Sequence, residues 1–163
     1  MVERNEVNLV VGCFRFKHAS VDHADAFELT GEKKYLDIAE KSLEFLSQIP
    51  FEKNHYSPIG QNGWFFRNRK RSYFDQQPED TASMVETKVA AYRISGKKSY
   101  LDDALKAFHW FLGKNHLGQM VYDESTGGCY DGVGQYALNL NQGAESTVSY
   151  LLARLTLEDV KIP

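Results

Sequence analysis

The sequence predicts an all-α domain of repeated αα-hairpins that curve into part of a helical toroid. Residues 26–39 match residues 91–104 at a constant offset of 65 residues, and each copy reads as helix, glycine turn and helix. This period is well above the roughly 34 residues of a tetratricopeptide repeat. Two long segments without clear periodicity, residues 50–77 and 113–140, separate the hairpins. Long hairpins with long connections suit a toroid, so we expect both segments to lie at the same end.

Apolar residues at three- and four-residue spacing predict the individual helices. They span residues 18–29, 35–49, 78–94, 100–112 and a final stretch that starts near residue 141. Gly31 and Gly96 suit the position just after a helix, and Pro50 stops the second helix. Pro78 fits the first turn of the third helix, where its missing N–H is no loss.

Three carboxylates near the starts of helices are the candidate catalytic residues: Asp75, Glu145 and Glu86. The apolar face of the final helix is formed by Val148, Leu151, Leu152 and Leu155. Glu145 lies at the edge of this face, where a carboxylate is costly unless it is paired or used. Two carboxylates facing one cleft are what cleavage of a glycosidic bond requires, one as acid and one as base or nucleophile. The alternative is that these acids only complement helix dipoles.

Polar side chains and rings of the same segments are the candidate substrate-binding residues: Gln76, Gln77, Trp64, Tyr130, Asp131, Asn141 and Gln142. The amides and Asp131 would orient hydroxyl groups, and Trp64 or Tyr130 would stack on a ring. A sugar suits this mixture because it has apolar faces and many hydroxyls. The alternative is that the rings pin the loops to the core. A basic run at residues 67–71 would meet a phosphate or an acidic sugar, or form a solvated loop.

Composition narrows the class of protein. The 163 residues fit one domain, and 42% hydrophobic with 25% charged residues is typical of a soluble globular protein. A net charge of −3 argues against nucleic-acid binding, and no apolar run is long enough for a membrane span. The first residues do not resemble a signal peptide, so we expect a cytoplasmic protein with Cys13 and Cys129 reduced.

Metal and cofactor motifs are missing from the sequence. His18 and Asp22 are four residues apart on a predicted helix, but no third group joins them, so we expect no metal site. There is no Walker loop, dinucleotide fingerprint or nucleophile elbow. We therefore expect no cofactor.

Four motifs in order resemble one family. They are residues 74–78 (FDQQP), 110–115 (WFLGKN), 127–132 (GGCYDG) and 141–147 (NQGAEST). Together they resemble a six-hairpin glycosidase-like domain that is found C-terminal to some prokaryotic glycosyltransferases and as a separate protein. The resemblance covers residues 20–157 and implies an (α/α)6-type toroid with a role in carbohydrate metabolism. Six hairpins need a much longer chain, so residues 1–163 look like a single domain that forms an incomplete toroid. Glu79 also departs from the family pattern, which has an apolar residue after the proline.

These observations predict a carbohydrate-handling domain, as a glycoside hydrolase-like protein or as the accessory domain of a glycosyltransferase. Its ligand would be a carbohydrate or a sugar phosphate. The alternative is a non-catalytic helical scaffold that binds other proteins. An incomplete ring leaves apolar helix faces uncovered, and large exposed apolar patches usually find a partner. We therefore expect a homodimer, or contact with a separate chain that completes the toroid.

Overall fold

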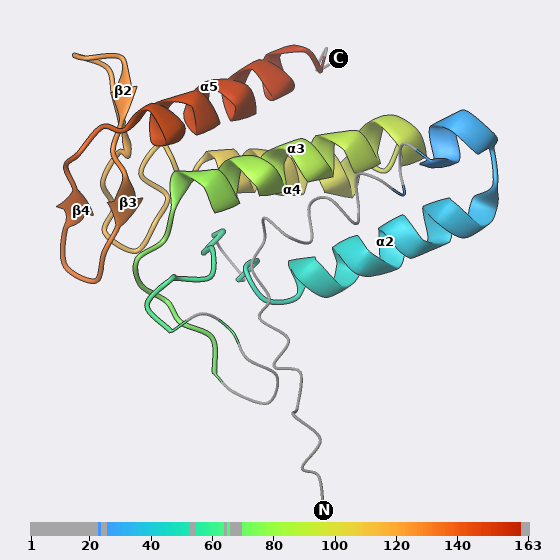
Figure 1. The fold of residues 1–163 in the computed structure, drawn as a ribbon, viewed down its shortest axis with the longest axis horizontal. Helices are drawn as coiled ribbons and strands as arrows, with labels where there is room; N and C mark the ends of the chain where they lie inside the picture. Colours follow the sequence, from blue (N-terminus) through green and yellow to red (C-terminus); the bar gives the residue numbers. More distant parts are fainter. Residues whose placement is uncertain (1–22, 24–25, 53–54, 64, 66–69, 161–163) are drawn as a thin grey trace, which may run out of the picture.

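The computed structural model describes residues 23, 26–52, 55–63, 65 and 70–160. The helices are α2 (Lys33–Ser47), α3 (Pro78–Ser95), α4 (Lys98–Phe108) and α5 (Ala144–Glu158). Two small antiparallel sheets pair β1 (Tyr122–Asp123) with β2 (Gly128–Cys129), and β3 (Gly132–Val133) with β4 (Leu138–Asn139). In Figure 1, α3 lies beside α4 and α5, and the short strands gather at the end where α3 and α5 begin.

The helices follow the predicted pattern, with shifts at their ends. Residues 26–30 form the end of the first predicted helix, whose start lies mostly outside the described residues. Helix α3 ends before Gly96, whose φ of 68° brings its N–H to the Tyr92 carbonyl. Helix α4 stops at Phe108, short of the expected residue 112. The side-chain amide of Asn115 binds the Trp110 carbonyl at 3.0 Å, and this contact holds the turns that replace further helix.

The glycine-rich segment 113–140 contains the two β-hairpins, which the sequence did not predict. Tyr122 pairs with Cys129 and Val133 pairs with Leu138. Each strand has only two residues. A strand this short cannot show the alternation of apolar and polar residues by which strands are detected.

The core lies where α3 packs against α4 and α5. Val85 and Val89 of α3, Ala104 of α4 and Ala153 of α5 are all fully buried. Aromatic rings extend this core beneath the hairpins. The ring of Tyr150 of α5 stacks on the ring of Tyr122 of β1, with the two centroids 4.2 Å apart. The rigid core therefore fixes where α3 and α5 begin, and so fixes the end of the molecule where the hairpins lie.

Lys88 is a charged residue inside this core. Its side chain is 2% exposed, and its Nζ lies 2.8 Å from Oδ2 of Asp103 on α4. The rings of Phe51 and Tyr100 lie 5.0 and 5.2 Å from Nζ. Burial lowers the pKa of Lys88. The ion pair therefore joins α3 to α4, and the Phe51 ring packs against the Lys88 ammonium group that forms it.

The two long segments meet, as the sequence predicted. Gln76 N donates to the Val133 carbonyl at 3.0 Å, and Val133 N donates to the Gln76 carbonyl at 2.9 Å. A Cβ at Gly132 would lie 2.8 Å from the Gln76 carbonyl oxygen, so glycine is needed for this close approach. One backbone bridge thus joins the segment before α3 to the hairpin before α5.

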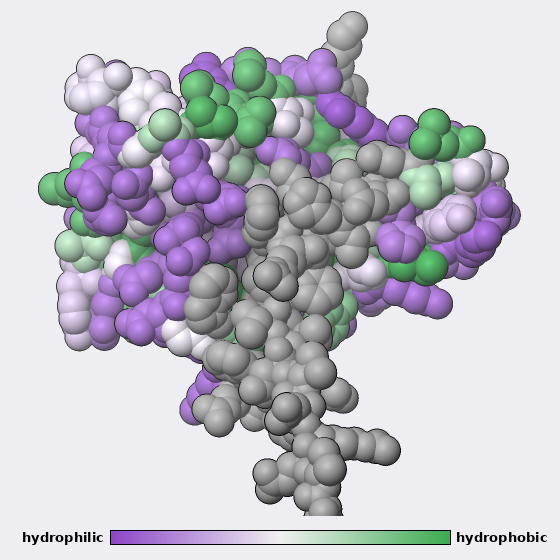
Figure 2. Space-filling model, in the orientation of Figure 1, coloured by the Kyte–Doolittle hydropathy of each residue, from purple (hydrophilic) through white to green (hydrophobic). Residues whose placement is uncertain are grey.

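Helix α5 buries a different face from the one that its apolar pattern predicted. Its buried side carries Ser146, Ser149, Tyr150, Ala153 and Leu157. The predicted apolar face of Val148, Leu151, Leu152 and Leu155 is exposed. Figure 2 shows hydrophobic residues gathered along this edge of the molecule. In the part of the chain that the structure describes, no helix is long and apolar enough to cross a membrane.

Candidate functional site

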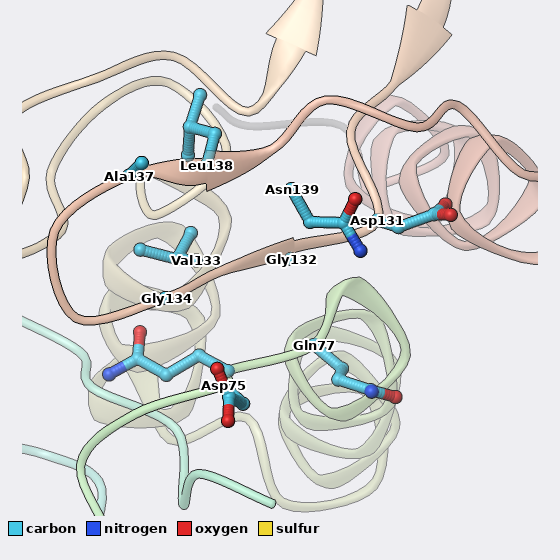
Figure 3. A pocket seen from close by; sticks show the side chains of 10 residues that line it. Asp75, Gln77, Asp131, Gly132, Val133, Gly134, Ala137, Leu138 and Asn139 are labelled. Carbon is cyan, nitrogen blue, oxygen red and sulfur yellow. The ribbon is translucent and has the colours of Figure 1, made fainter.

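Two adjoining hollows lie at the end of the molecule where α3 and α5 begin. The first, of about 350 Å³, is lined by residues 75–77, 131–134 and 137–139. The second, of about 310 Å³, is lined by residues 77–79, 131, 139 and 143–146. Gln77, Asp131 and Asn139 line both, so the two hollows form one continuous groove, called the loop-end groove below. Figure 3 shows the β3–β4 hairpin on one side and the segment from Asp75 to Gln77 on the other.

Asp75 lines the first hollow, and its backbone is strained. Its φ is 58°, in the left-handed region, and it is the one residue other than glycine at positive φ among those described. Aspartate tolerates this region better than most residues, and such strain is typically found at functional sites. Gln61 N donates to the Asp75 carbonyl at 3.1 Å, which helps to hold the conformation. The carboxylate is exposed at the groove.

The Gln76 side chain is buried, and its amide is bound inside the protein rather than presented to the groove. Its Oε1 accepts a hydrogen bond from Trp110 Nε1 at 2.7 Å. Its Nε2 donates to Ser57 Oγ at 3.1 Å and to the Tyr73 carbonyl at 2.9 Å. Gln76, which was expected to orient a sugar hydroxyl, thus has its amide oxygen and both amide hydrogens bound within the protein, between Asp75 and Gln77. Gln77 is partly exposed and lines both hollows.

Arg71 supports the same network from the other side. Its guanidinium donates to the Ile49 carbonyl, to the Ser57 carbonyl and Oγ, and to Glu52 Oε1, at 2.6 to 2.9 Å. The side chain is 6% exposed and lies over the Tyr73 ring. Arg71 is therefore committed to structure rather than to a phosphate. Most of the basic run, residues 67–69, lies outside the described residues.

Asp131 fixes the start of α5. Its Oδ1 accepts hydrogen bonds from Gly143 N and Ser146 Oγ, both at 2.7 Å. Gly143 is the N-cap residue and offers no side chain, and Asp131 accepts the N–H of Gly143 itself, one of the donors that a helix start leaves without an intrahelical partner. A Cβ at Gly143 would lie 2.8 Å from Asp131 Oδ1, which explains the glycine. Asp131 also lines both hollows, at the positive end of the α5 dipole.

The structure brings Asp75 and Glu145 to one groove but not Glu86. Glu145 is exposed in the first turn of α5 and lines the second hollow, opposite Glu79 in the first turn of α3. Its expected position at the edge of a buried apolar face is corrected, because that face points outward. Glu86 lies eight residues beyond Pro78 on α3, about 12 Å along the helix at 1.5 Å per residue, and lines neither hollow.

Tyr130, Asn141 and Gln142 lie beside the groove without lining it. Tyr130 OH and Gln142 Nε2 donate to Asp123 Oδ2 at 3.1 and 3.0 Å. Hydrogen bonds from Ser125, with smaller contributions from Tyr130 and Gln142, lower the pKa of Asp123 to about 2. These side chains therefore hold the β1–β2 hairpin against the start of α5.

The remaining predicted residues add little to the groove. Asn141 contributes its carbonyl, which accepts a hydrogen bond from Asp131 N at 2.8 Å. Trp64 lies outside the described residues. Burial raises the pKa of Cys129 to about 12, which disfavours the reactive thiolate form. Among the described residues, no group of three or more His, Cys, Asp or Glu side chains is placed to hold a metal ion.

Three residues at or beside the groove were not predicted as site residues from the sequence. Asn139 lines both hollows, and Figure 3 shows its side chain between β4 and Gln77. Glu79 is one of the carboxylates at a helix start and departs from the family pattern, but it was not chosen as a site residue. Tyr136 is 85% exposed on the turn between β3 and β4, beside Ala137 of the first hollow. The alternation of leucine and asparagine at residues 138–141 was the available signal for Asn139.

No protein-family model matches the sequence, and comparison with curated proteins gives no match either. Solved structures do match. A family 76 glycoside hydrolase (mannosidase) from Bacteroides thetaiotaomicron superposes with a TM-score of 0.66 at 17% identity, over 88% of this chain and 38% of that one. An inactive variant of an α-1,6-mannanase from a Salegentibacter species, in complex with α-1,6-mannotriose, gives 0.67 at 15%, over 93% and 42%. A cellobiose 2-epimerase from Bacillus thermoamylovorans gives 0.67 at 14%, over 93% and 40%.

These solved structures have the six-hairpin toroid fold. At such low identity the similarity establishes the fold alone. The chain therefore has the fold of an arc of an (α/α)6 toroid, which confirms the predicted fold class in part, because the segment 113–140 adds two β-hairpins to the helices. It spans about two fifths of the length of the structures described above.

Replacing Gln76 by leucine should destabilise the protein. The change removes three side-chain hydrogen bonds and leaves the buried Trp110 N–H without its acceptor. We expect a loss of about 3 kcal/mol in the free energy of unfolding, measured by urea denaturation. Gln77→Leu is the matched control, because the Gln77 side chain makes no capping hydrogen bond. It should change stability by less than about 0.5 kcal/mol. Equal losses in the two variants would contradict the role assigned to Gln76.

Acid should weaken the hydrogen bonds to the Asp123 carboxylate that hold the β1–β2 hairpin against the start of α5. The pKa of Asp123 is depressed from 3.8 to about 2, so its contribution to stability is present above pH 3.8 and lost as the pH falls through about 2. Wild type should melt at a higher temperature than Asp123→Asn near neutral pH. The difference should shrink between about pH 4 and about pH 2. A difference that stays constant down to about pH 2 would show that the charge of Asp123 is not what anchors the hairpin.

Proposed function

We propose that the loop-end groove binds a neutral glycan, and that this chain is the site-bearing arc of a glycoside hydrolase-like protein. The observation that carries the proposal is the set of groups that line one groove. Besides the internally bound Gln76, four carboxylates and two side-chain amides line it: Asp75, Glu79, Asp131, Glu145, Gln77 and Asn139. Carboxylates and amides are the groups that bind sugar hydroxyls, as acceptors and as donors.

Asp75 and Glu145 are the pair proposed for catalysis. They come from different loops and line different hollows of the same groove, so a sugar bound across the groove would have a carboxylate on either side. Such a pair supplies the acid and the base or nucleophile of glycoside hydrolysis. Asp131 is occupied with the start of α5 and is proposed to position Glu145. Glu86 is not retained, because it lies outside the groove.

Neutral sugars are favoured over sugar phosphates by the charge of the groove. Every ionisable side chain that lines the two hollows is an acid. A phosphate would meet like charges there, which disfavours binding. The nearby Arg71 is bound by four internal acceptors and is not free to compensate. Of the two ligand classes expected from the sequence, the neutral carbohydrate is therefore proposed.

The exposed ring of Tyr136 provides the proposed stacking surface in place of Tyr130. It sits on the turn of the β3–β4 hairpin, whose residues 134 and 137 line the first hollow. The hydroxyl of Tyr130 is bound to Asp123, as described above. A ring that is free at the rim of a polar groove suits the apolar face of a sugar.

The solved structures of similar fold suggest a first ligand. One of them holds α-1,6-mannotriose, and two are described as acting on mannose-containing substrates. We propose this trisaccharide as the first probe for the groove. A role as the accessory domain of a glycosyltransferase is the second proposal. It rests on the sequence motifs and predicts binding without cleavage.

Asp75→Asn and Glu145→Gln should each weaken binding of α-1,6-mannotriose by about tenfold, the value of one charge-assisted hydrogen bond. If the bound sugar is cleaved, turnover should fall by at least about a hundredfold. Asparagine also tolerates the backbone of Asp75, so the fold should be kept. Calorimetric titration beside thermal melting gives both readouts. Glu86→Gln is the matched control and should bind as wild type. Wild-type affinity in both groove variants would reject the site.

Charge selectivity tests the ligand class separately. At low ionic strength, mannose 6-phosphate should bind at least about tenfold more weakly than mannose, and added salt should narrow the gap. Nuclear magnetic resonance titration suits these weak affinities. The groove variants Asp75→Asn and Glu145→Gln should bind the phosphate better than wild type does. Tighter binding of the phosphate by wild type would contradict the proposed ligand class.

A further inference from the structure

The two hollows of the loop-end groove differ in chemistry. The first has an apolar wall on the β3–β4 hairpin, formed by Val133, Ala137 and Leu138 (Figure 3), and the exposed ring of Tyr136 stands beside it. The second is lined mostly by polar side chains, at the first turns of α3 and α5. The first hollow therefore suits the apolar face of a sugar ring, and the second suits hydroxyl groups.

Each hollow has room for one sugar unit. The two volumes, about 350 and 310 Å³, lie near the lower end of the range of about 300–1,000 Å³ that small-ligand pockets cover. A ligand that occupies the whole groove therefore needs more than one sugar unit.

The two sides of the first hollow are joined by His116, in addition to the backbone bridge described above. His116 Nε2 lies 2.9 Å from the carbonyl oxygen of Gly134, which belongs to the hairpin side. The rings of His116 and Phe74 meet edge to face with centroids 5.5 Å apart, and Phe74 directly precedes Asp75 on the other side. The second hollow is fixed by Asp131, which binds the start of α5. Walls that are already in place reduce the ordering that binding would otherwise cost.

The hollows meet at Gln77, Asp131 and Asn139, called the waist below. Asn139 Oδ1 accepts a hydrogen bond from Asn141 N at 3.3 Å, so the NH₂ group of Asn139 remains as a donor. The Gln77 side chain makes no capping hydrogen bond to α3. These two amides supply donors between the hollows. The oxygens around a glycosidic linkage are acceptors, so the waist suits the linkage between two sugar units.

We infer that the loop-end groove recognises a disaccharide unit, with one sugar in each hollow and the glycosidic linkage at the waist. This inference rests on the proposed function and specifies the size of ligand that the groove takes. The sugar in the first hollow lays an apolar face against Tyr136, and the sugar in the second binds Glu79 and Glu145 through its hydroxyls. Linking the two units makes the binding of the second one intramolecular, which raises the affinity.

Titration of the whole chain with mannose and with α-1,6-mannobiose, followed by nuclear magnetic resonance, tests the inference. Wild type should bind the disaccharide at least about tenfold more tightly than mannose. Two variants narrow one hollow each with the same side chain: Ala137→Leu narrows the first hollow, and Ala144→Leu narrows the second. Both alanines are exposed, so the core should be unchanged, and thermal melting checks that each variant is folded.

The two variants should act differently on the two sugars. Ala144→Leu should lower the affinity for α-1,6-mannobiose to about that for mannose, a loss of at least about tenfold, and should leave mannose binding unchanged. Ala137→Leu should weaken the binding of both sugars, because a single sugar prefers the hollow with the aromatic ring. The matched control Gln135→Leu changes an exposed residue of the same turn outside both hollows, and should bind both sugars as wild type does.

The outcomes separate this inference from the proposed function. Wild type that binds neither sugar would reject the proposed function and the inference with it. Equal affinity for the two sugars, or unchanged disaccharide binding in Ala144→Leu, would leave the groove as a sugar site but overturn the disaccharide unit. If Ala144→Leu weakened mannose binding and Ala137→Leu did not, the placement of the stacked sugar in the first hollow would be wrong.

Discussion

The backbone pairing of Gln76 with Val133 is the contact on which the candidate site depends. It joins two segments that are distant in the sequence, at the point where each leads into a helix. The side chain of Gln76 strengthens the joint by binding the fully buried Trp110, so the pairing is anchored to the hydrophobic core. Asp75 on one side of the bridge and the β3–β4 hairpin on the other are then held at a fixed separation. The groove is the space that this joint leaves between them.

The acids of the groove gather there because two helices begin there. Glu79 and Glu145 occupy the first turns of α3 and α5, and Asp131 binds the N–H of the α5 N-cap. Exposed N–H groups at helix starts carry a partial positive charge that favours carboxylates. Helix-end acids and groove acids are therefore the same residues. The two interpretations that the sequence left open for them are not exclusive, because capping a helix and facing a groove are compatible at a helix start.

The periodic parts of the fold were predictable, and the parts made by long-range contacts were not. The α3 boundaries follow from Pro78 and Gly96, whose conformations are local properties. The outward face of α5 was not predictable, because apolar spacing identifies a stripe without saying what covers it. In α5 the buried side is built from two serines, an alanine, Tyr150 and Leu157, and the serines in its first half are not marked by a hydrophobic pattern.

The residues of the candidate site also divide into those that the local sequence predicts and those that only long-range contacts determine. Asp75, Gln77, Asp131 and Glu145 were identified as polar residues at loop ends, which a sequence reveals. The inward turn of Gln76 depends on Trp110 and Ser57, residues 34 and 19 positions away, so no local pattern signals it. Gln76 and Gln77 are chemically identical and adjacent, yet one is buried and the other lines the groove. Only the path of the chain distinguishes them.

The α5 helix takes part in both the groove and an exposed apolar face. Its first turn carries Glu145 into the second hollow, and its outer face carries the exposed residues Val148, Leu151, Leu152 and Leu155, the first of them one turn after Glu145. Any molecule bound to this face would stand next to the groove and would change how much of the groove water reaches. Excluding water strengthens the hydrogen bonds and charge interactions made inside a site. The helix that places Glu145 in the groove therefore also carries the surface through which a contact would change the environment of that carboxylate.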